Sequence, residues 1–454
     1  MTGSLLTLRT RANRTFLLLL AAIPFMTWAT PAAAESSPNV LMISVDTLRA
    51  DRLSSYGYGR NTSPNIDRLL ARGARFEEAR TVEPLTGPAM ATMLTSRHPH
   101  EHGATRNALK IKTGLSSVSK ILRRRGYITA AFVSNWVLRG TYSGLDDHFH
   151  EYHEVLTRKR WLGMFKGESY AEDVTEAVID WLDEREDERA PFFIWAHYTD
   201  PHAPYLYRSE HAKRLNIPPD GRESIEDRYD TEIAAVDAAV GDLLEAIQND
   251  PRLRESTLVV FTSDHGESFG EHGVWGHGRF LWEEAVRIPL GFVLPGRIRP
   301  RVIEEAARII DIAPTILGLA EVPVPEAFLG FDWSGVLRSN ENPPILPMLM
   351  QAHRGSPVRG RNPQASRQAG LLEIAVVHGS RKESWRTDPG TYRVFDLRAD
   401  PAERNDLAGK QQPMPPSIGE WLAAVHAGLR TTSEIPAALD AEAVEKLRSL
   451  GYLE

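Results

Sequence analysis

The sequence predicts an α/β fold of the doubly wound kind, with a smaller sheet attached near the C-terminus. Two apolar, strand-like runs, "NVLMISVD" and "TLVVFTSDHGE", each lead into an acidic residue. Helical patterns such as "SYAEDVTEAVIDWLDERE" and "EIAAVDAAVGDLLEAI" alternate with the strand-like "YITAAFVS" and "PFFIWAHY". This alternation is typical of buried parallel strands that are covered by helices.

Composition sets the broad class of the protein. The 454 residues are 42% hydrophobic and 25% charged, which is ordinary for a globular chain of one large α/β domain and a smaller one. The formal net charge of −7 gives no general attraction for nucleic acid, so we expect no nucleic-acid partner. The chain contains no cysteine, and the fold therefore depends on its core and not on disulfides.

The N-terminal segment has the three parts of a secretory signal. Three arginines precede the apolar run "FLLLLAAIPFMTW", and the small-residue stretch "PAAAES" follows it. We therefore expect a signal peptide at residues 1–34, cleavage after Ala34 and a periplasmic or secreted protein. The alternative is a membrane anchor, but a spanning helix needs about 20 apolar residues and this run is shorter. We expect no stable membrane anchor.

The rest of the chain divides at a change of composition. Residues 35–342 carry the alternating pattern of the large α/β domain, and residues 343–369, rich in Pro, Arg and Gly, are predicted to be a linker. Residues 370–454 form a smaller α+β subdomain, in which "GLLEIAVVHG" and "TYRVFDL" are strands and "SIGEWLAAVHAGL" begins the terminal helices.

Two acids stand at the ends of predicted strands. Asp46 and Asp264 each follow a buried run, and ligands of open α/β sheets bind at the carboxyl ends of the strands. With His265 they form a donor set that suits a divalent cation. The alternative for Asp46 is a loop or helix cap.

The loop "SDHGESFGEHGVWGHG" is too rich in glycine and histidine for a buried strand or an ordinary helix. It is best explained by a site where backbone approaches a ligand closely. His265 and His277 are candidates for contact with metal or substrate. For His272 two roles are open: it contacts metal or substrate, or it only fixes the conformation of the loop.

Thr86 lies where a helix is expected to begin. Gly87 and Pro88 follow it, and "AMATMLTSR" has helix-forming character. The positive end of a helix favours an anion and lowers the free energy of an alkoxide. The alternative is that Thr86 only caps the helix.

The segment "WAHYTDPHAPY" follows another apolar strand and contains two histidines. Pro201 and Pro204 restrict the loop around His202, which is a candidate proton donor or oxyanion partner. His197, nearer the strand, is expected to be a core histidine.

Taken together, these segments resemble the sulfatase family of the alkaline phosphatase superfamily. The resemblance runs through "NVLMISVDTLRAD", "LTSRHPHEHG", "DPHAPY", "SDHGESFGEHG", "LWEEAVRIPL" and "YRVFDLRADPAERNDL", in the family's order. It implies a central mixed β-sheet flanked by helices, a smaller C-terminal α+β subdomain, and ester hydrolysis with a bound divalent metal.

The chain departs from the family pattern at two places. Thr86 holds the position of the Cys or Ser that matures to formylglycine, and Met90 replaces the motif arginine. In "SNWVL" only Trp136 remains of the family's Lys-Trp-His sequence, with Asn135 before it. Superfamily relatives that transfer phosphoryl groups use an unmodified threonine, and their metal set resembles Asp46, Thr86, Asp264 and His265 here.

Three functions follow as hypotheses. The first is an exported, metal-dependent hydrolase of a sulfuric or phosphoric ester of a small molecule or glycan, with Thr86 attacking and His202 or His277 assisting. The second is a phosphoryl or phosphoethanolamine-type transferase with a phospho-Thr intermediate. The third is a non-catalytic anion-binding relative.

The residues of the expected site do not fix the identity of the metal ion or every contact to the substrate. The cofactor is one divalent ion, Ca, Mn or Zn, and His265 among the ligands favours Mn or Zn. Arg97, His202 and His277 are expected to bind the substrate anion, although Arg97 has the alternative of a salt bridge within the fold. The oligomeric state is not predicted.

Overall fold

The computed structural model describes residues 37–160, 165–185, 189–339, 341–353, 370–409 and 413–431. The predicted signal peptide at residues 1–34 lies outside these residues. These described residues belong to one compact unit. No helix in the described part of the chain is both long and apolar enough to cross a bilayer.

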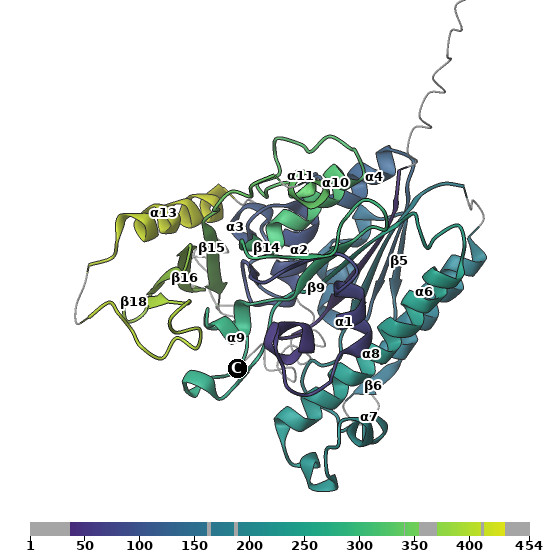
Figure 1. Ribbon diagram of the computed structural model, residues 1–454. Helices are drawn as coiled ribbons and strands as arrows, with labels where there is room; N and C mark the ends of the chain where they lie inside the picture. The colour runs from purple at the N-terminus through teal and green to yellow at the C-terminus, as the bar shows by residue number, and fades with distance from the viewer. Residues whose placement is uncertain are drawn as a thin grey trace, which may run out of the picture. The chain divides into compact units, whose positions relative to one another are not determined.

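A mixed sheet of eight strands forms the centre of this unit (Figure 1). Five neighbouring strands run parallel, β12 is antiparallel to both of its neighbours, and β13 is parallel to β2. In spatial order the strands are β13 (Arg301–Ile303), β2 (Ala74–Phe76), β12 (Leu290–Val293), β9 (Thr257–Ser263), β1 (Asn39–Val45), β8 (Phe192–Tyr198), β4 (Ile128–Val133) and β5 (Glu151–Glu154). The expected central mixed sheet is confirmed.

The central strands are apolar because both faces of the sheet are covered. Every residue of β1, β8 and β9 is buried. Successive side chains of a strand point to opposite faces, so Val40 and Met42 join one core cluster while Leu41 and Ile43 join the other. Continuous apolar runs of this kind are the signature of a sheet buried on both sides.

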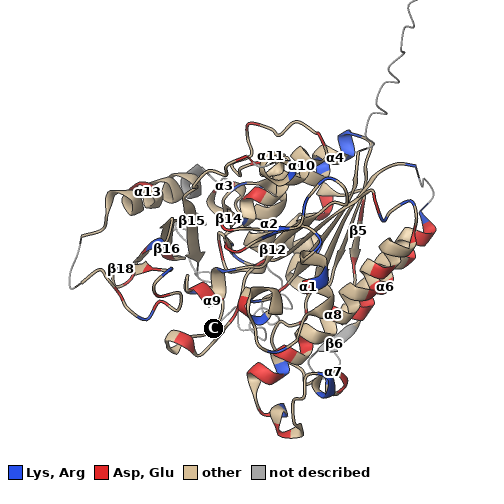
Figure 2. Ribbon diagram, viewed as in Figure 1, with Lys and Arg blue, Asp and Glu red and all other residues tan. Residues whose placement is uncertain are grey.

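Helices cover the two faces. On one face α1 (Pro64–Leu70), α6 (Ala171–Glu184) and α8 (Ile225–Asn249) pack against the sheet, and α6 lies along α8 (Figure 1). On the other face lie α2 (Thr86–Thr95), α4 (Val118–Arg124) and α10 (Ile312–Leu319). Acidic residues recur along α6, as Figure 2 shows, while its buried positions face the core.

The C-terminal part builds a second, antiparallel sheet in the order β15 (Met348–His353), β16 (Leu371–His378), β17 (Arg381–Arg386) and β18 (Thr391–Asp396). Helix α13 (Pro416–Thr431) packs on β16 and buries Ile418, Trp421 and Val425. The small sheet beside the catalytic domain and the helix after it agree with the prediction.

One predicted boundary is wrong. Residues 343–369 were expected to be a linker, but Met348–His353 form strand β15. Met348, Met350 and Ala352 alternate along this strand and bury their side chains in one apolar cluster. The alternation of apolar residues was not recognised, because the segment is short and its neighbours are rich in Pro and Arg. Residues 354–369 lie outside the described residues.

Short elements complete the described chain. The remaining helices are α3 (Pro99–His102), α5 (Gly140–Ser143), α7 (Ser209–Arg214), α9 (Glu283–Val286) and α11 (Ser334–Arg338). Short strands are β3 (Ala79–Arg80), β6 (Arg158–Arg160), β7 (Phe165–Glu168), β10 (Ser268–Phe269), β11 (Trp275–Gly276) and β14 (Ala307–Arg308). Single 3₁₀ turns are η1 (Ala50–Arg52), η2 (Ser54–Tyr56), η3 (Trp136–Leu138), η4 (Asp146–His148), η5 (Pro219–Arg222), η6 (Glu271–Gly273) and η7 (Ile309–Asp311).

Candidate active site

Two acids and a histidine meet at the carboxyl edge of the central sheet. Asp46 follows β1 and Asp264 follows β9, and these parallel strands are paired up to Val45 and Ser263. His265 Nε2 lies 3.8 Å from Asp46 Oδ1 and 3.4 Å from Asp264 Oδ2. The structure therefore brings together the three residues that the sequence placed at strand ends.

This cluster fits a divalent cation. All three side chains are fully buried, and one ligand atom of each lies within 4.8 Å of the others. Asp46 Oδ1 and Asp264 Oδ2 have no hydrogen-bond partner among the described residues. Burial raises the pKa of Asp46 to about 7, and burial together with the Asp46 charge raises that of Asp264. A bound cation would keep both carboxylates ionised.

Hydrogen bonds hold the other carboxylate oxygens. The backbone N–H groups of Thr47 and His265 donate to Asp264 Oδ1 at 3.1 and 2.8 Å. Asn135 Nδ2 donates to Asp46 Oδ2. The residue that departs from the family's Lys-Trp-His sequence thus contacts a candidate metal ligand, and its amide orients that ligand.

His197 also faces Asp46, although the sequence predicted a core histidine. Ser44 Oγ accepts from Trp195 Nε1 at 2.8 Å and is hydrogen-bonded to His197 Nδ1 at 3.0 Å. The other ring nitrogen, Nε2, lies 3.7 Å from Asp46 Oδ2. Burial lowers the pKa of His197 to about 4, which keeps the ring neutral.

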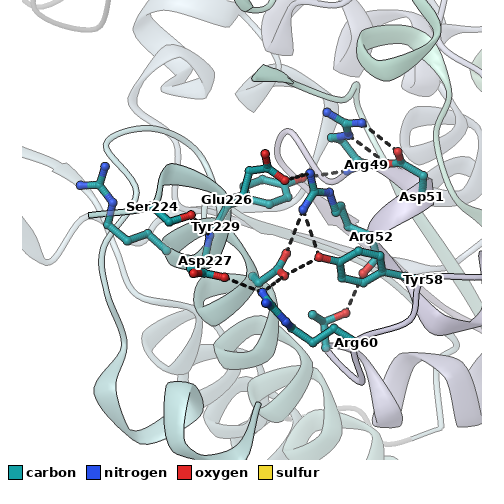
Figure 3. A network of polar contacts seen from close by, with 12 residues as sticks. Arg49, Asp51, Arg52, Tyr58, Arg60, Ser224, Glu226, Asp227 and Tyr229 are labelled. Carbon is teal, nitrogen blue, oxygen red and sulfur yellow. Dashed lines mark hydrogen bonds and ion pairs between the residues drawn. The ribbon is translucent and has the colours of Figure 1, made fainter. Parts of the chain in front are cut away.

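The loop after β1 is fixed by contacts with the loop after β9 and with α8, and Figure 3 shows the contacts with α8. Thr47 has φ 56°, a conformation that a β-branched residue adopts only under constraint. Tyr229 of α8 donates its hydroxyl proton to Thr47 O at 2.7 Å and accepts from Arg49 N at 2.9 Å. Arg49 in turn donates to Glu267 O and Glu271 Oε1 on the loop after β9. The two acid-bearing loops are thereby held in one arrangement.

Thr86 is the first residue of α2, and its hydroxyl does not cap the helix. Leu85 occupies the N-cap position, with no capping side chain, while Thr86 Oγ1 lies 3.5 Å from His265 Nε2. His265 Nδ1 donates to Gly266 O at 2.9 Å, so Nε2 of the neutral ring presents its lone pair toward Thr86. Burial, followed by the neighbouring His277, lowers the pKa of His265 well below its usual value and keeps the ring neutral.

His277 and His202 complete the cluster. The His277 ring centroid lies 4.3 Å from that of His265 and 5.4 Å from that of His202. His277 Nδ1 donates to Glu267 Oε1 at 2.9 Å, and Glu267 Oε2 accepts from Tyr205 at 2.8 Å. Burial opposes the charged form of His277, but the Glu267 carboxylate outweighs burial and raises the pKa. His277, supported by Glu267, can therefore hold a proton and deliver it.

Two residues singled out in the sequence lie elsewhere. Arg97 was expected to bind substrate, but it follows the C-terminal end of α2, a helix of about 15 Å whose first residue is Thr86. The structure does not bring Arg97 to the other site residues. His272 stacks on Trp282 with 3.9 Å between ring centroids, which supports the interpretation that it holds the loop.

Three polar residues of this cluster were not predicted as functional. Glu267 follows Asp264 by three positions in the glycine-rich loop, and its place between two histidines could have marked it. Asn135 and His197 carried no such signal, because the partner of each, Asp46, is about 90 or more positions away in the chain.

Comparison with known proteins finds one family for this chain. The sequence model described as Sulfatase matches residues 38–322. Among curated relatives, an N-acetylglucosamine-6-O-sulfatase of Bacteroides thetaiotaomicron is 26% identical, with 88% of each chain covered. Human arylsulfatase A is 28% identical, with 88% of this chain and 87% of the relative covered.

Solved structures share the fold. A protein in complex with its substrate D-glucosamine-2-N,6-O-disulfate superposes with a TM-score of 0.68 and 21% identity, covering 88% of this chain and 99% of that one. A phosphonate monoester hydrolase of Agrobacterium radiobacter superposes with a TM-score of 0.64 and 22% identity, covering 92% and 96%.

Proposed function

The chain belongs to the sulfatase family and is a hydrolase of ester bonds, and on this basis we propose that it cleaves a sulfuric or phosphoric ester with the hydroxyl of Thr86. The observation that carries the proposal is the position of Thr86 Oγ1, buried at the start of α2 and 3.5 Å from His265 Nε2. An unmodified hydroxyl here supports a reaction that needs no formylglycine.

Thr86 acts as the nucleophile. Its hydroxyl proton is lost to solvent, its oxygen attacks the sulfur or phosphorus atom, and the bond between that atom and the leaving oxygen breaks. The positive end of α2 favours the ionised hydroxyl and the anionic ester. In the second step a water molecule gives a proton to the now neutral His277 and attacks the threonine ester, whose bond to Thr86 Oγ1 breaks, so that sulfate or phosphate is released and Thr86 is restored.

His277 supplies the proton for the leaving oxygen. Its Nδ1 is held by Glu267, so the opposite nitrogen, Nε2, is the one that can give a proton away from the carboxylate. His202, whose ring centroid lies 5.4 Å from that of His277, binds the substrate anion in this arrangement.

Asp46, Thr86, Asp264 and His265 are the residues that would hold the divalent cation. When bound, the cation supplies positive charge against the negative charge that develops on the ester and on the attacking oxygen. Two carboxylates and one imidazole suit Mn or Zn better than Ca, which prefers oxygen donors throughout.

The substrate is proposed to be an ester of a small molecule or a glycan. The relatives named above include a sulfatase of N-acetylglucosamine and a structure with a disulfated glucosamine, while another neighbour hydrolyses phosphonate monoesters. Both the sulfuric and the phosphoric class therefore belong in the assay.

Export is part of the same proposal. The N-terminal pattern supports cleavage after Ala34 and a periplasmic or secreted enzyme. N-terminal sequencing of the protein recovered outside the cytoplasm tests it, and a mature chain that retains Arg9 and Arg14 would contradict it.

A non-catalytic relative is the second candidate. Met90, where the family has arginine, is fully buried among apolar side chains, and Asn135 is engaged with Asp46. Fewer charged groups are therefore available to the substrate anion. A transferase shares the first step with the hydrolase and differs only in whether an alcohol or water attacks the threonine ester.

Matched nitrophenyl sulfate, phosphate and phosphodiester substrates, each with Ca, Mn or Zn, test these functions. We expect turnover by the wild type and a loss of at least about 10³-fold in kcat for Thr86→Ala, with partial retention in Thr86→Ser. Full activity of Thr86→Ala would show that Thr86 is not the nucleophile. Product formed on an added alcohol would establish the transferase, and anion binding without turnover would establish the non-catalytic relative.

A further inference from the structure

A buried histidine of the small sheet is held by an acid of the catalytic domain. His353 is the last residue of β15 and is 2% exposed. Its backbone N–H and its ring nitrogen Nδ1 lie 3.1 and 3.0 Å from Glu83 Oε1. Glu83 is itself fully buried, and its Oε2 accepts from Gln351 Nε2 at 3.3 Å. The Glu83 carboxylate therefore fixes the position of the His353 ring.

The same contact leaves the second ring nitrogen of His353 as an acceptor. Glu83 Oε1 already accepts from the backbone N–H of His353, so Nδ1 is the ring nitrogen that donates to it. In the neutral ring Nε2 then carries the lone pair. Nε2 is buried and has no hydrogen-bond partner among the described residues. A buried acceptor without a partner is unfavourable in a folded protein, which points to a partner that the polypeptide itself does not supply.

The segment from Glu83 to Thr86 connects His353 to the candidate active site. Three residues of extended chain span at most about 11 Å, so the Glu83 backbone lies no farther than this from that of Thr86. A Cβ at Gly278, the residue after His277, would lie 2.7 Å from Leu85 Cδ2. The segment between Glu83 and Thr86 therefore contacts the loop of His277, while Glu83 contacts the end of β15.

A hydroxyl group of the substrate fits the free acceptor. The ester group reacts at Thr86, so a partner of His353 belongs to the alcohol part of the ester. An acceptor needs a donor, and the donors that an alcohol carries besides its esterified oxygen are further hydroxyl groups. A glycan has such hydroxyl groups next to the ester, whereas an ester of a simple alcohol has none.

We propose that His353 Nε2 accepts a hydrogen bond from a hydroxyl group of a glycan ester bound at Thr86, and that it selects such esters over those of simple alcohols. This inference rests on the proposed function and deepens it, because it names the class of alcohol. A ligand without the hydroxyl would leave the buried acceptor unpaired, which is the physical basis of the selection. The small sheet thereby contributes a residue to the substrate site.

Binding of analogues that cannot be cleaved tests the contact. Sulfonates and phosphonates of glucose, galactose and N-acetylglucosamine, with a CH₂ group in place of the ester oxygen at the primary position, are titrated by calorimetry in the presence of Mn²⁺. Propylsulfonate and propylphosphonate are the matched ligands without a hydroxyl group. We expect the wild type to bind at least one sugar analogue about tenfold more tightly than the matched propyl ligand.

His353→Asn is the sharpest variant. The NH₂ group of asparagine takes the place of Nδ1 and keeps a donor to Glu83, but nothing replaces Nε2. We expect this variant to lose the preference for the sugar analogue while its affinities for the propyl ligand and for Mn²⁺ stay unchanged, which a merely structural role would not produce. His378→Asn, which changes an exposed histidine of the same sheet, should keep the preference. If His353→Asn does not melt cooperatively, His353→Ser replaces it with the same expected loss.

Two results would overturn the proposal: a wild type that binds no sugar analogue more tightly than the propyl ligands, or a folded His353 variant that keeps the preference. Neither depends on turnover, so failure of the proposed function is seen separately. A preference that requires His353, in a protein that hydrolyses none of the esters tested, supports the hydroxyl contact and contradicts the hydrolase. Hydrolysis that requires Thr86, without any preference for sugars, supports the hydrolase and contradicts the hydroxyl contact.

Discussion

His277 Nδ1 and Glu267 Oε1 are joined by a hydrogen bond of 2.9 Å, and this bond determines which nitrogen of the ring can contact the substrate. With Nδ1 committed to the carboxylate, Nε2 is the nitrogen that can deliver a proton. Tyr205 holds the second oxygen of Glu267, so the carboxylate is fixed from both sides.

Glu267→Gln should slow the cleavage of esters with poor leaving groups. The amide no longer stabilises a charged His277, and general acid catalysis contributes about 10²- to 10⁴-fold. We expect kcat for a phenyl or alkyl ester to fall about 100-fold and kcat for the nitrophenyl ester to fall much less, since nitrophenolate leaves without a proton. Tyr205→Phe, which leaves the Glu267 contact with His277 in place, is the control. An equal fall for both leaving groups would mean that the residue only supports the fold.

Asn135→Ala should weaken metal binding. Its amide orients Asp46, and removing such a partner of a metal ligand typically reduces affinity about 10- to 100-fold. Calorimetric titration with Mn²⁺ measures this, beside Asn61→Ala as an exposed control. Unchanged affinity would show that the amide is dispensable to Asp46.

Tyr229→Phe should lower both stability and metal affinity. The hydroxyl lost here holds Thr47 and Arg49, and a buried hydrogen bond of this kind contributes about 1–3 kcal/mol when one partner is removed. Tyr198→Phe is the matched control, because its hydroxyl is equally buried but meets Thr175. Urea unfolding should show a loss in both variants, while Mn²⁺ titration should show one only in Tyr229→Phe. If Tyr229→Phe and the wild type bound Mn²⁺ with the same affinity, the conformation of the Thr47 loop would not affect metal binding.

Removal of the cation should lower the melting temperature. A ligand that binds only the folded state at 100 times its dissociation constant adds about 2.7 kcal/mol of stability. We expect EDTA to lower Tm of the wild type by several degrees and to leave Tm of Asp264→Asn unchanged. A wild-type melting curve insensitive to EDTA and to added Mn²⁺ would contradict the metal assignment.

Acid should destabilise the contact between the catalytic domain and the small sheet. Burial opposes ionisation of Glu283, but Arg80 at 2.7 Å and Lys382 at 3.0 Å outweigh it and lower the pKa below 4.5. A lowered folded pKa gives stability that is present above about pH 4.5 and is lost as the pH falls further. Urea unfolding at pH 7 and pH 3 should therefore show a smaller difference for Glu283→Gln than for the wild type.

The same variant should already be less stable at pH 7, by about 1–3 kcal/mol, because Arg80 and Lys382 each lose one charged partner and keep only Glu78 and Glu403. Glu326→Gln, at an exposed position, should match the wild type at both pH values. A pH dependence equal to that of the wild type would exclude Glu283 as the titrating group.

The sheet was predictable because its strands are apolar and lead into polar residues, as β1 and β9 do before Asp46 and Asp264. Strand β17, "RKESWR", was missed because its exposed face is charged and its buried side chains include Lys382, whose ion pairs appear only in three dimensions. Local periodicity identifies an element only when burial follows hydrophobicity.

The site was predictable where chemistry and position coincide along the chain, as at Asp264 and His265. The assignment of Arg97 to the substrate stays a prediction, and the structure places this residue after the end of the helix that begins at Thr86. Asn135 contacts Asp46 through a single hydrogen bond to a distant segment, and an isolated asparagine carries no pattern that reveals such a partner.

The two halves of the proposed cation site are far apart in the chain, and this has a consequence for how the metal would be acquired. The hydrogen bond from Thr47 to Asp264 spans 217 positions of the chain, so these groups come together only after the strands between them have paired. The unfolded polypeptide therefore has no preformed site for the ion, and the metal would bind only after the chain has folded. A chain that crosses a membrane unfolded would take its metal from the compartment in which it arrives, and the ion available there would set which metal the mature protein carries.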